Sequence, residues 1–208
     1  MPGALRGTPI DWNIVVVGAW NVAILTPEGI ARRLFNLEPG TPIQVQVAMD
    51  VGAPIRVRHD NIIVQPSPTS LVITPQESTP EALANSVTIA QRALDSLPET
   101  PMTAAGLNIR YQYEQCPDSL IEAGNSVIDD KLTDAAFEIT EKMLKRKIVW
   151  DDGVLNLDVH ERDDASALVV FNYHKNSNLP GELGDWLGKH AQMLENCATI
   201  IDTLVEEE

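Results

Sequence analysis

Two helix starts in this chain repeat one local pattern, and this repetition constrains the fold more than any other feature. The segment "ILTPEGI" begins a short helix at Pro27, and "EQCPDSL" begins another at Pro117. Each proline is followed by an acidic residue and, two positions further on, by an aliphatic one. Proline lacks the N–H that has no partner in a first turn, and the acid complements the helix dipole. The two starts therefore predict matching helices at an offset of 90 residues.

A second pair of helix starts lies further along the chain. The segment "STPEALANSVTIAQRALDSLP" predicts a helix, in which Ser78 and Glu81 form a capping box around Pro80. Pro180 opens the long last helix, "PGELGDWLGKHAQMLENCATIIDTLVEE". Apolar positions of the two helices match at an offset of 100 residues: Leu83 with Leu183, Val87 with Leu187, and Leu94 with Leu194.

Strand-like segments fill the space between these helices in the same order. Alternating or β-branched residues predict strands at 13–25, 42–50, 54–60, 61–65 and 70–74, and again at 104–115, 137–150, 154–161 and 167–174. We therefore predict an α+β fold of two similar β-α-β-β-β-β-α halves, an antiparallel sheet with one long helix per half. Residues 1–12 would be an N-terminal extension, 13–100 the first repeat and 101–208 the second, together forming one compact unit.

This order of elements resembles the TATA-binding-protein-like and helix-grip folds, in which a curved antiparallel sheet holds one long helix per unit. The resemblance covers the whole chain as an order of elements, and it implies a fold rather than an activity. No functional motif of these families is present, so no binding residue is carried over. The acidic charge argues against the DNA-binding role of the best-known member, whose underside is basic.

The formal net charge of −15 limits the possible partners. Such a surface repels phosphate backbones and anionic membranes, so we expect binding to neither nucleic acid nor membrane; a basic protein or a cation would suit it. The apolar-rich run 14–25 is much shorter than the ~20 residues of a membrane span. Cys116 and Cys197 are far apart and have no metal-ligand spacing, which predicts a reduced, cytoplasmic protein.

The segment "NLDVHERDD" contains the only metal-ligand candidates, and they are weak. Asp158 and His160 would share one face of a strand and could reach one divalent cation. Leucine and valine fill the alternate positions, and the acids at 163–164 are typical of a turn. A solvated hairpin is the favoured interpretation, because the sequence places no third ligand.

No catalytic site can be assembled from the sequence. There is no GxSxG segment, no Cys–His signature and no phosphate-binding glycine loop. His190 lies on the apolar face of the last helix and is expected to be a core histidine, while His59 and His174 fall at strand ends. We therefore predict a protein that is not an enzyme and has no catalytic residue and no cofactor.

Two segments are candidates for protein contacts. Trp186, Met193 and Ile200 recur every seven residues along one flank of the last helix, where either core packing or an interface would explain them. The basic segment "KMLKRK" at 142–147 is typical of an edge strand protected by lysine. An acidic partner, or an ion pair with the "VEEE" tail of another subunit, is the alternative explanation.

The leading functional hypothesis is a non-catalytic binding or assembly protein that acts through protein contacts, with a homodimer as its expected state. The first alternative is a small-ligand binder that uses a cavity between the sheet and a long helix. An acidic inhibitor that mimics nucleic acid is the second alternative, and it rests on the net charge alone.

Overall fold

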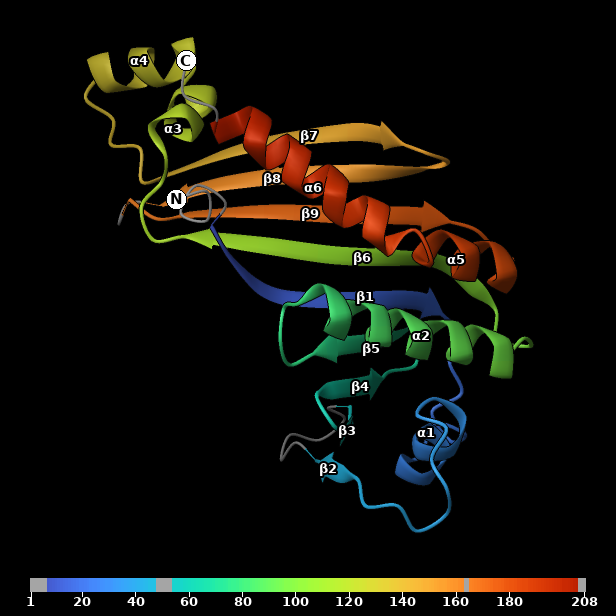
Figure 1. Ribbon diagram of the computed structural model, residues 1–208. Helices are drawn as coiled ribbons and strands as arrows, with labels where there is room; N and C mark the ends of the chain where they lie inside the picture. The colour runs from blue at the N-terminus through green and yellow to red at the C-terminus, as the bar shows by residue number, and fades with distance from the viewer. Residues whose placement is uncertain (1–6, 48–53, 163–164, 206–208) are drawn as a thin grey trace.

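The computed structural model describes residues 7–47, 54–162 and 165–205, which form an α+β fold with six helices and one nine-stranded antiparallel sheet (Figure 1). The strands are β1 (Thr8–Gly18), β2 (Gln44–Gln46), β3 (Arg56–His59), β4 (Ile62–Pro66), β5 (Ser70–Pro75), β6 (Met102–Tyr113), β7 (Glu141–Trp150), β8 (Gly153–Arg162) and β9 (Ala167–Asn176). The helices are α1 (Pro27–Arg33), α2 (Pro80–Ser96), α3 (Asp118–Gly124), α4 (Val127–Asp134), α5 (Pro180–Leu187) and α6 (His190–Val205). The predicted α+β class with an antiparallel sheet is confirmed.

The strands form one continuous sheet in the order β2-β3-β4-β5-β1-β6-β9-β8-β7. Every neighbouring pair is antiparallel. The pair β1–β6 lies inside the sheet and joins the strands that precede residue 100 to those that follow it. The short β2 forms one edge, and the ten-residue β7 forms the other.

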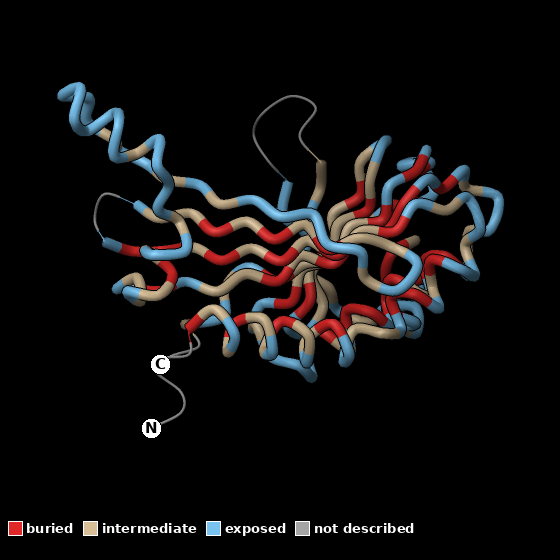
Figure 2. Tube along the Cα trace, turned by 90° about the horizontal axis from the view of Figure 1, so that it is seen from above, coloured by how far each residue is buried: buried red, intermediate tan, exposed pale blue. Residues whose placement is uncertain are grey.

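The long helices cover one face of this sheet. Helix α2 packs on β1 and β5, and α5 packs on β6 and β9; α6 crosses in front of the strands that follow residue 100 (Figure 1). Along the central strands, buried and half-buried residues alternate (Figure 2). Because successive side chains of a strand point to opposite faces, the buried set packs on the helices and the half-buried set lies on the opposite face.

The core lies between the sheet and the helix layer. Its largest fully buried side chains include residues from both sheet and helices: Ile14, Ile73, Leu107, Phe171, Tyr173, Leu83, Leu94 and Trp186. The Tyr173 hydroxyl donates to the Asn196 side chain at 2.7 Å. This hydrogen bond ties β9 to α6 inside the apolar layer, where an unpaired hydroxyl would be costly.

Threonine side chains cap the first two proline-opened helices. The Thr26 hydroxyl accepts from the Gly29 N–H at 3.1 Å, and the Thr79 hydroxyl accepts from the Ala82 N–H at 3.2 Å. In both cases the proline follows the capping threonine directly. The predicted capping box of Ser78 is therefore wrong by one residue, because the N-cap is the residue that immediately precedes Pro80.

The last helix is divided, which changes the face that it buries. At the division, the Lys189 N–H bonds the Trp186 carbonyl at 3.1 Å, three residues back, and so tightens the turn between α5 and α6. Because of the tightened turn, the side chains of α6 point in other directions around the helix axis than they would in an unbroken continuation of α5. Leu187 stays buried, but Leu194 is only half-buried and Met193 takes the core position instead.

Several predicted boundaries also differ from the structure. β1 begins at Thr8, inside the predicted extension, and the predicted strand residues 19–25 lie in irregular structure and a turn. Helix α4 was not predicted, because its apolar residues have no buried face: none of them is buried. Met49, the acids at 163–164 and the end of the "VEEE" tail lie outside the described residues.

Within the described residues, none of the helices is long and apolar enough to cross a membrane.

Candidate functional site

The sheet surface opposite the helices is the largest candidate site, and we call it the open face. It consists of the alternate, half-buried side chains of β1 and of β3 through β9. Among the described residues, no helix packs on it. Strand register shows which side chains meet there. Asn13 pairs with Asn108, Asn108 with Asn172, and Asn172 with Asn156. These asparagines form one row across β1, β6, β9 and β8.

The amide side chains of this row are hydrogen-bonded in one direction. Asn156 donates to Asn172 at 2.9 Å, Asn172 donates to Asn108 at 2.6 Å, and Asn108 donates to Asn13 at 2.8 Å. Each amide has two N–H groups and an oxygen with two lone pairs, so each retains bonding capacity toward solvent. The row is therefore a polar, uncharged strip that can both donate to and accept from a bound molecule.

The row ends at a β-bulge in β1. The register of β1 with β6 shifts between Ile10 and Asn13, and Asp11 has a positive φ of 49°. The Asp11 carbonyl accepts from the Asn13 amide at 3.3 Å and from the Arg110 guanidinium at 2.8 Å. A bulge of this kind redirects side chains locally, and here it fixes the position of a cation at the end of the asparagine row.

Basic residues flank the row on the open face. Arg110 lies two residues beyond Asn108 on β6, and Lys147 is in register with Asn156. Lys145, the next residue on the same face of β7, forms an ion pair with Asp158 at 3.2 Å. At the other end of the sheet, Arg56 and Arg58 flank the buried Val57 on β3. The open face thus gathers cations from segments that are far apart in the chain.

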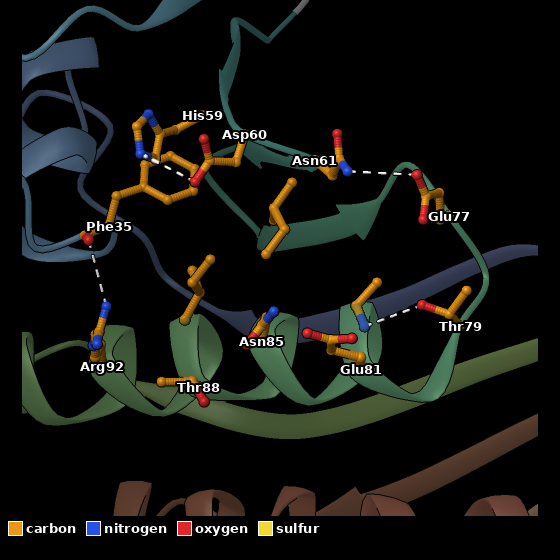
Figure 3. Close-up of a pocket in the computed structure, with 13 residues that line it drawn as sticks. Phe35, His59, Asp60, Asn61, Glu77, Thr79, Glu81, Asn85, Thr88 and Arg92 are labelled. Atoms are coloured by element: carbon orange, nitrogen blue, oxygen red, sulfur yellow. Dashed lines mark hydrogen bonds and ion pairs between the residues drawn. The ribbon is translucent and has the colours of Figure 1, made fainter.

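A second candidate is a groove between α2 and the β3–β4 turn, with a volume of about 520 Å³ (Figure 3). One wall is a face of α2 that carries Glu81, Asn85, Thr88 and Arg92. The opposite wall comes from the end of α1 and from the β3–β4 turn, including Phe35, His59, Asp60 and Asn61. The groove exists because α2 lies over β1 and β5 and leaves the outer strands uncovered.

The groove has a cationic and aromatic end and an acidic end. At the first end, Arg92 donates to the Leu34 and Phe35 carbonyls at 3.3 and 3.4 Å, and the ring of Phe35 lies 5.5 Å from that of His59. At the other end, Glu77 accepts a long hydrogen bond of 3.5 Å from Asn61. Ile62 and Ile89 are buried beneath the groove. A small molecule with polar ends and an apolar centre would match this lining.

The predicted metal candidates lie on the open face, and each has a charged neighbour. Asp158 accepts from Lys145, and His160 Nδ1 lies 3.9 Å from a Glu141 oxygen. The alternation that the sequence predicted is present, because Val159, which lies between them in the sequence, is buried on the other face. In the described ranges no group of at least three His, Cys, Asp or Glu could hold a metal ion.

The three predicted interface residues have different environments. Trp186 and Met193 are only 1% and 0% exposed within this single chain, whereas Ile200 is half-buried. The rings of Trp150 and Trp186 meet edge to face at 6.1 Å. Two of the three side chains therefore belong to the core of the chain. For Met193 the reason is the turn at Lys189, which directs this flank of α6 toward the sheet, whereas Trp186 lies on α5, before that turn.

The thiols and histidines do not form a nucleophilic site. Burial raises the pKa of the Cys197 thiol to about 12. The pKa of Cys116 is also raised, first by burial and then by the Glu161 charge. Both thiols are protonated at neutral pH, and a protonated thiol is a poor nucleophile. His190 is half-buried on α6, and its Nδ1 has no partner in the part of the chain that the structure describes.

Exposed apolar residues gather beside the start of β7. Helix α4 exposes Val127 and Ile128 by 70% and 66%, and Phe137 after it is 63% exposed. Met143, near the start of β7, is 46% exposed. An eight-residue helix without a buried side chain is marginal by itself in water. Sequence reasoning missed this surface because its residues are separated along the chain and follow no single period.

No protein-family model matches this chain, and no curated protein matches it.

Proposed function

We propose that this protein is a non-catalytic binding protein that holds another polypeptide against the open face of its sheet. The observation that carries this proposal is the uncovered face itself. On β1, β6, β9 and β8 it presents an uncharged amide row with valines beside it, such as Val15 and Val170. A surface of this kind supplies both hydrogen bonds and apolar contact.

The size of the face supports a protein partner. Neighbouring strands are about 4.8 Å apart, and ten residues span about 33 Å, so the part from β1 to β7 measures roughly 24 by 33 Å. This is about 800 Å², the area that each partner contributes to a standard protein interface. A second copy of the chain would bring two cation-bearing faces together, which is unfavourable. A different polypeptide is therefore the favoured partner, and a homodimer is the competing form of the proposal.

Site-specific cross-linking tests this function. A photo-reactive amino acid at position 170 would lie at the centre of the open face, between Arg110 and Asp158 in register. The matched control is position 192, where Gln192 is exposed on α6. We expect intermolecular adducts from position 170 and none from position 192 in the cells that make the protein. Equal adduct formation at both positions would refute binding through the open face. Adducts that contain only this chain would establish the homodimer.

A small-ligand binder is the second candidate function, and the groove of Figure 3 is the observation that favours it. This groove lies between the sheet and a long helix. Native mass spectrometry of the purified protein would detect a retained small molecule. Thr88→Trp would fill the groove from its exposed α2 wall and should abolish retention. If no added mass is retained by the unmodified protein, this candidate fails.

We also infer that the fold repeats one plan. The strand order supports this. Taken from the outside of the sheet to its middle, β3-β4-β5-β1 on one side corresponds to β7-β8-β9-β6 on the other. Along the chain, β5 is followed by the helix that begins at Pro80, and β9 is followed by the helix that begins at Pro180. The additional strand β2 and the additional helix α4 are the departures from this correspondence. Superposition of residues 13–97 on 104–205 tests the inference, and a poor fit of the paired helices would refute it.

A further inference from the structure

We propose that the open face binds an acidic, extended segment of its protein partner. This inference rests on the proposed function and adds the chemistry of the partner. The whole chain has 30 Asp and Glu against 15 Lys and Arg, yet the open face has the opposite balance. Its cations along β3, β6 and β7 are Arg56, Arg58, Arg110, Lys145 and Lys147. On the open face of these strands and of β8, Asp158 is the acid that lies away from the strand ends. Glu141 lies at the start of β7, where it is opposite Arg162.

Three of these five cations are hydrogen-bonded to neutral groups, which do not compensate their charge. Arg110 donates to the Asp11 carbonyl at 2.8 Å, and Arg56 donates to the Gln65 amide oxygen at 2.7 Å. Arg58 donates to the Asp60 carbonyl at 3.0 Å. Within the described residues, none of these three arginines forms an ion pair with a carboxylate. The open face consequently has a local positive charge that an acidic side chain would neutralise.

Apolar residues flank the two cations on the open face of β7. Met143, Lys145, Lys147 and Val149 share the open face of this strand, and Met143 and Val149 are 46% and 83% exposed. β7 is also an edge of the sheet, so its outer backbone groups are available to another strand. An extended segment in which acidic and apolar residues alternate would suit this edge, because its period of two places all of its acids on one face, where they would lie beside Lys145 and Lys147.

A polypeptide fits this face better than nucleic acid does. Single-stranded nucleic acids bind to sheets through stacking on aromatic side chains. The Trp, Tyr and Phe residues of β1, β6, β9 and β7 lie on the helix side. Tyr113 is buried there, and ring contacts join Trp12 with Tyr111, Tyr111 with Phe171, and Tyr173 with Trp150. The net charge of −15 also repels a long polyanion at a distance, while a short acidic segment contacts only the cationic face.

Fluorescence anisotropy with a defined peptide tests the proposal. The probe is a labelled peptide as long as β7 (10 residues) in which glutamate and leucine alternate. The comparison peptide has glutamine in place of glutamate, and a single-stranded oligonucleotide is the third probe. The test variant is Lys145→Glu combined with Lys147→Glu. The control is Arg32→Glu combined with Arg33→Glu, which makes the same change of charge on α1, in the helix layer.

We expect the acidic peptide to bind the unmodified protein at least about tenfold more tightly than the glutamine peptide does, and the β7 variant to lose at least about tenfold in affinity. The α1 control should stay within about twofold, and its circular dichroism and urea midpoint should match those of the β7 variant. Equal binding of the two peptides, or equal losses in the two variants, would overturn the proposal. Tighter binding of the oligonucleotide would overturn it in favour of nucleic acid.

The cross-linking result separates this inference from the proposed function. If the acidic peptide fails to bind while position 170 still forms adducts with a partner, the open face binds protein and the acidic chemistry is wrong. If neither the peptide nor a partner reaches position 170, the proposed function itself fails.

Discussion

Replacement of Trp186 by alanine distinguishes a core residue from an interface residue. The indole is 1% exposed, lies edge to face against Trp150 and fits over the backbone of Gly153, whose added Cβ would lie 3.2 Å from the ring. All of these contacts are within one chain. The structure therefore predicts that Trp186→Ala destabilises the fold and leaves any assembly of folded molecules unchanged.

The magnitude follows from the buried volume. Truncation of a fully buried tryptophan to alanine costs about 3–5 kcal/mol, and the lost aromatic pair places Trp186 in the upper part of this range. For a chain of 208 residues, each 1 kcal/mol lowers the melting temperature by about 2–4 °C, so the expected decrease is about 6–20 °C. Trp186→Phe should cost less than about 2 kcal/mol, because the Nε1 group has no hydrogen-bond partner among the described residues.

Urea unfolding followed by circular dichroism measures this effect without interference from the removed fluorophore. Ile200→Ala is the matched control on the same helix, because Ile200 is half-buried and should lose less. Native mass spectrometry of the same samples reports assembly. A nearly unchanged urea midpoint for Trp186→Ala, together with weakened self-association, would refute the placement of this residue in the core.

Other predictions follow from particular contacts. Leu187→Ala should cost about 2–5 kcal/mol and clearly more than Leu194→Ala in the same urea assay, because Leu187 is 0% exposed and Leu194 is half-buried. Burial raises the pKa of Tyr113 from 10.0 to about 12, so its contribution to stability is present below pH 10 and is lost as the pH rises toward 12. Tyr113→Phe should therefore reduce the loss of stability measured between pH 9 and 12, and an unchanged profile would contradict this. The Lys189 hydrogen bond lowers the pKa of Asp151, so this ion pair stabilises the fold at neutral pH and its contribution disappears as the pH falls through that lowered pKa. Lys189→Met should weaken the dependence of the urea midpoint on pH in the acidic range, and an identical dependence would argue against the pair.

Local patterns predicted most of the individual elements. The alternation of Leu155, Leu157 and Val159 predicted β8 and its buried face, and the proline-opened segments predicted α1 and α2 to within a few residues. These signals depend on neighbours along the chain, because strand and helix periods are local properties. The same reasoning could not detect the turn at Lys189, and it therefore left the flank of Met193 open between core packing and an interface.

The sequence by itself determined the class of the fold, the main strands and helices, and the acidic net charge. Only the tertiary structure decided which residues share a surface. Asn13 and Asn156 become part of one hydrogen-bonded row only through the pairing of β1, β6, β9 and β8. Arg110 and Lys147 likewise lie on one cationic face, which the net charge of −15 conceals. The physical reason is that strand order and register join segments far apart in the chain, whereas composition averages over all of them and periodicity describes each one alone.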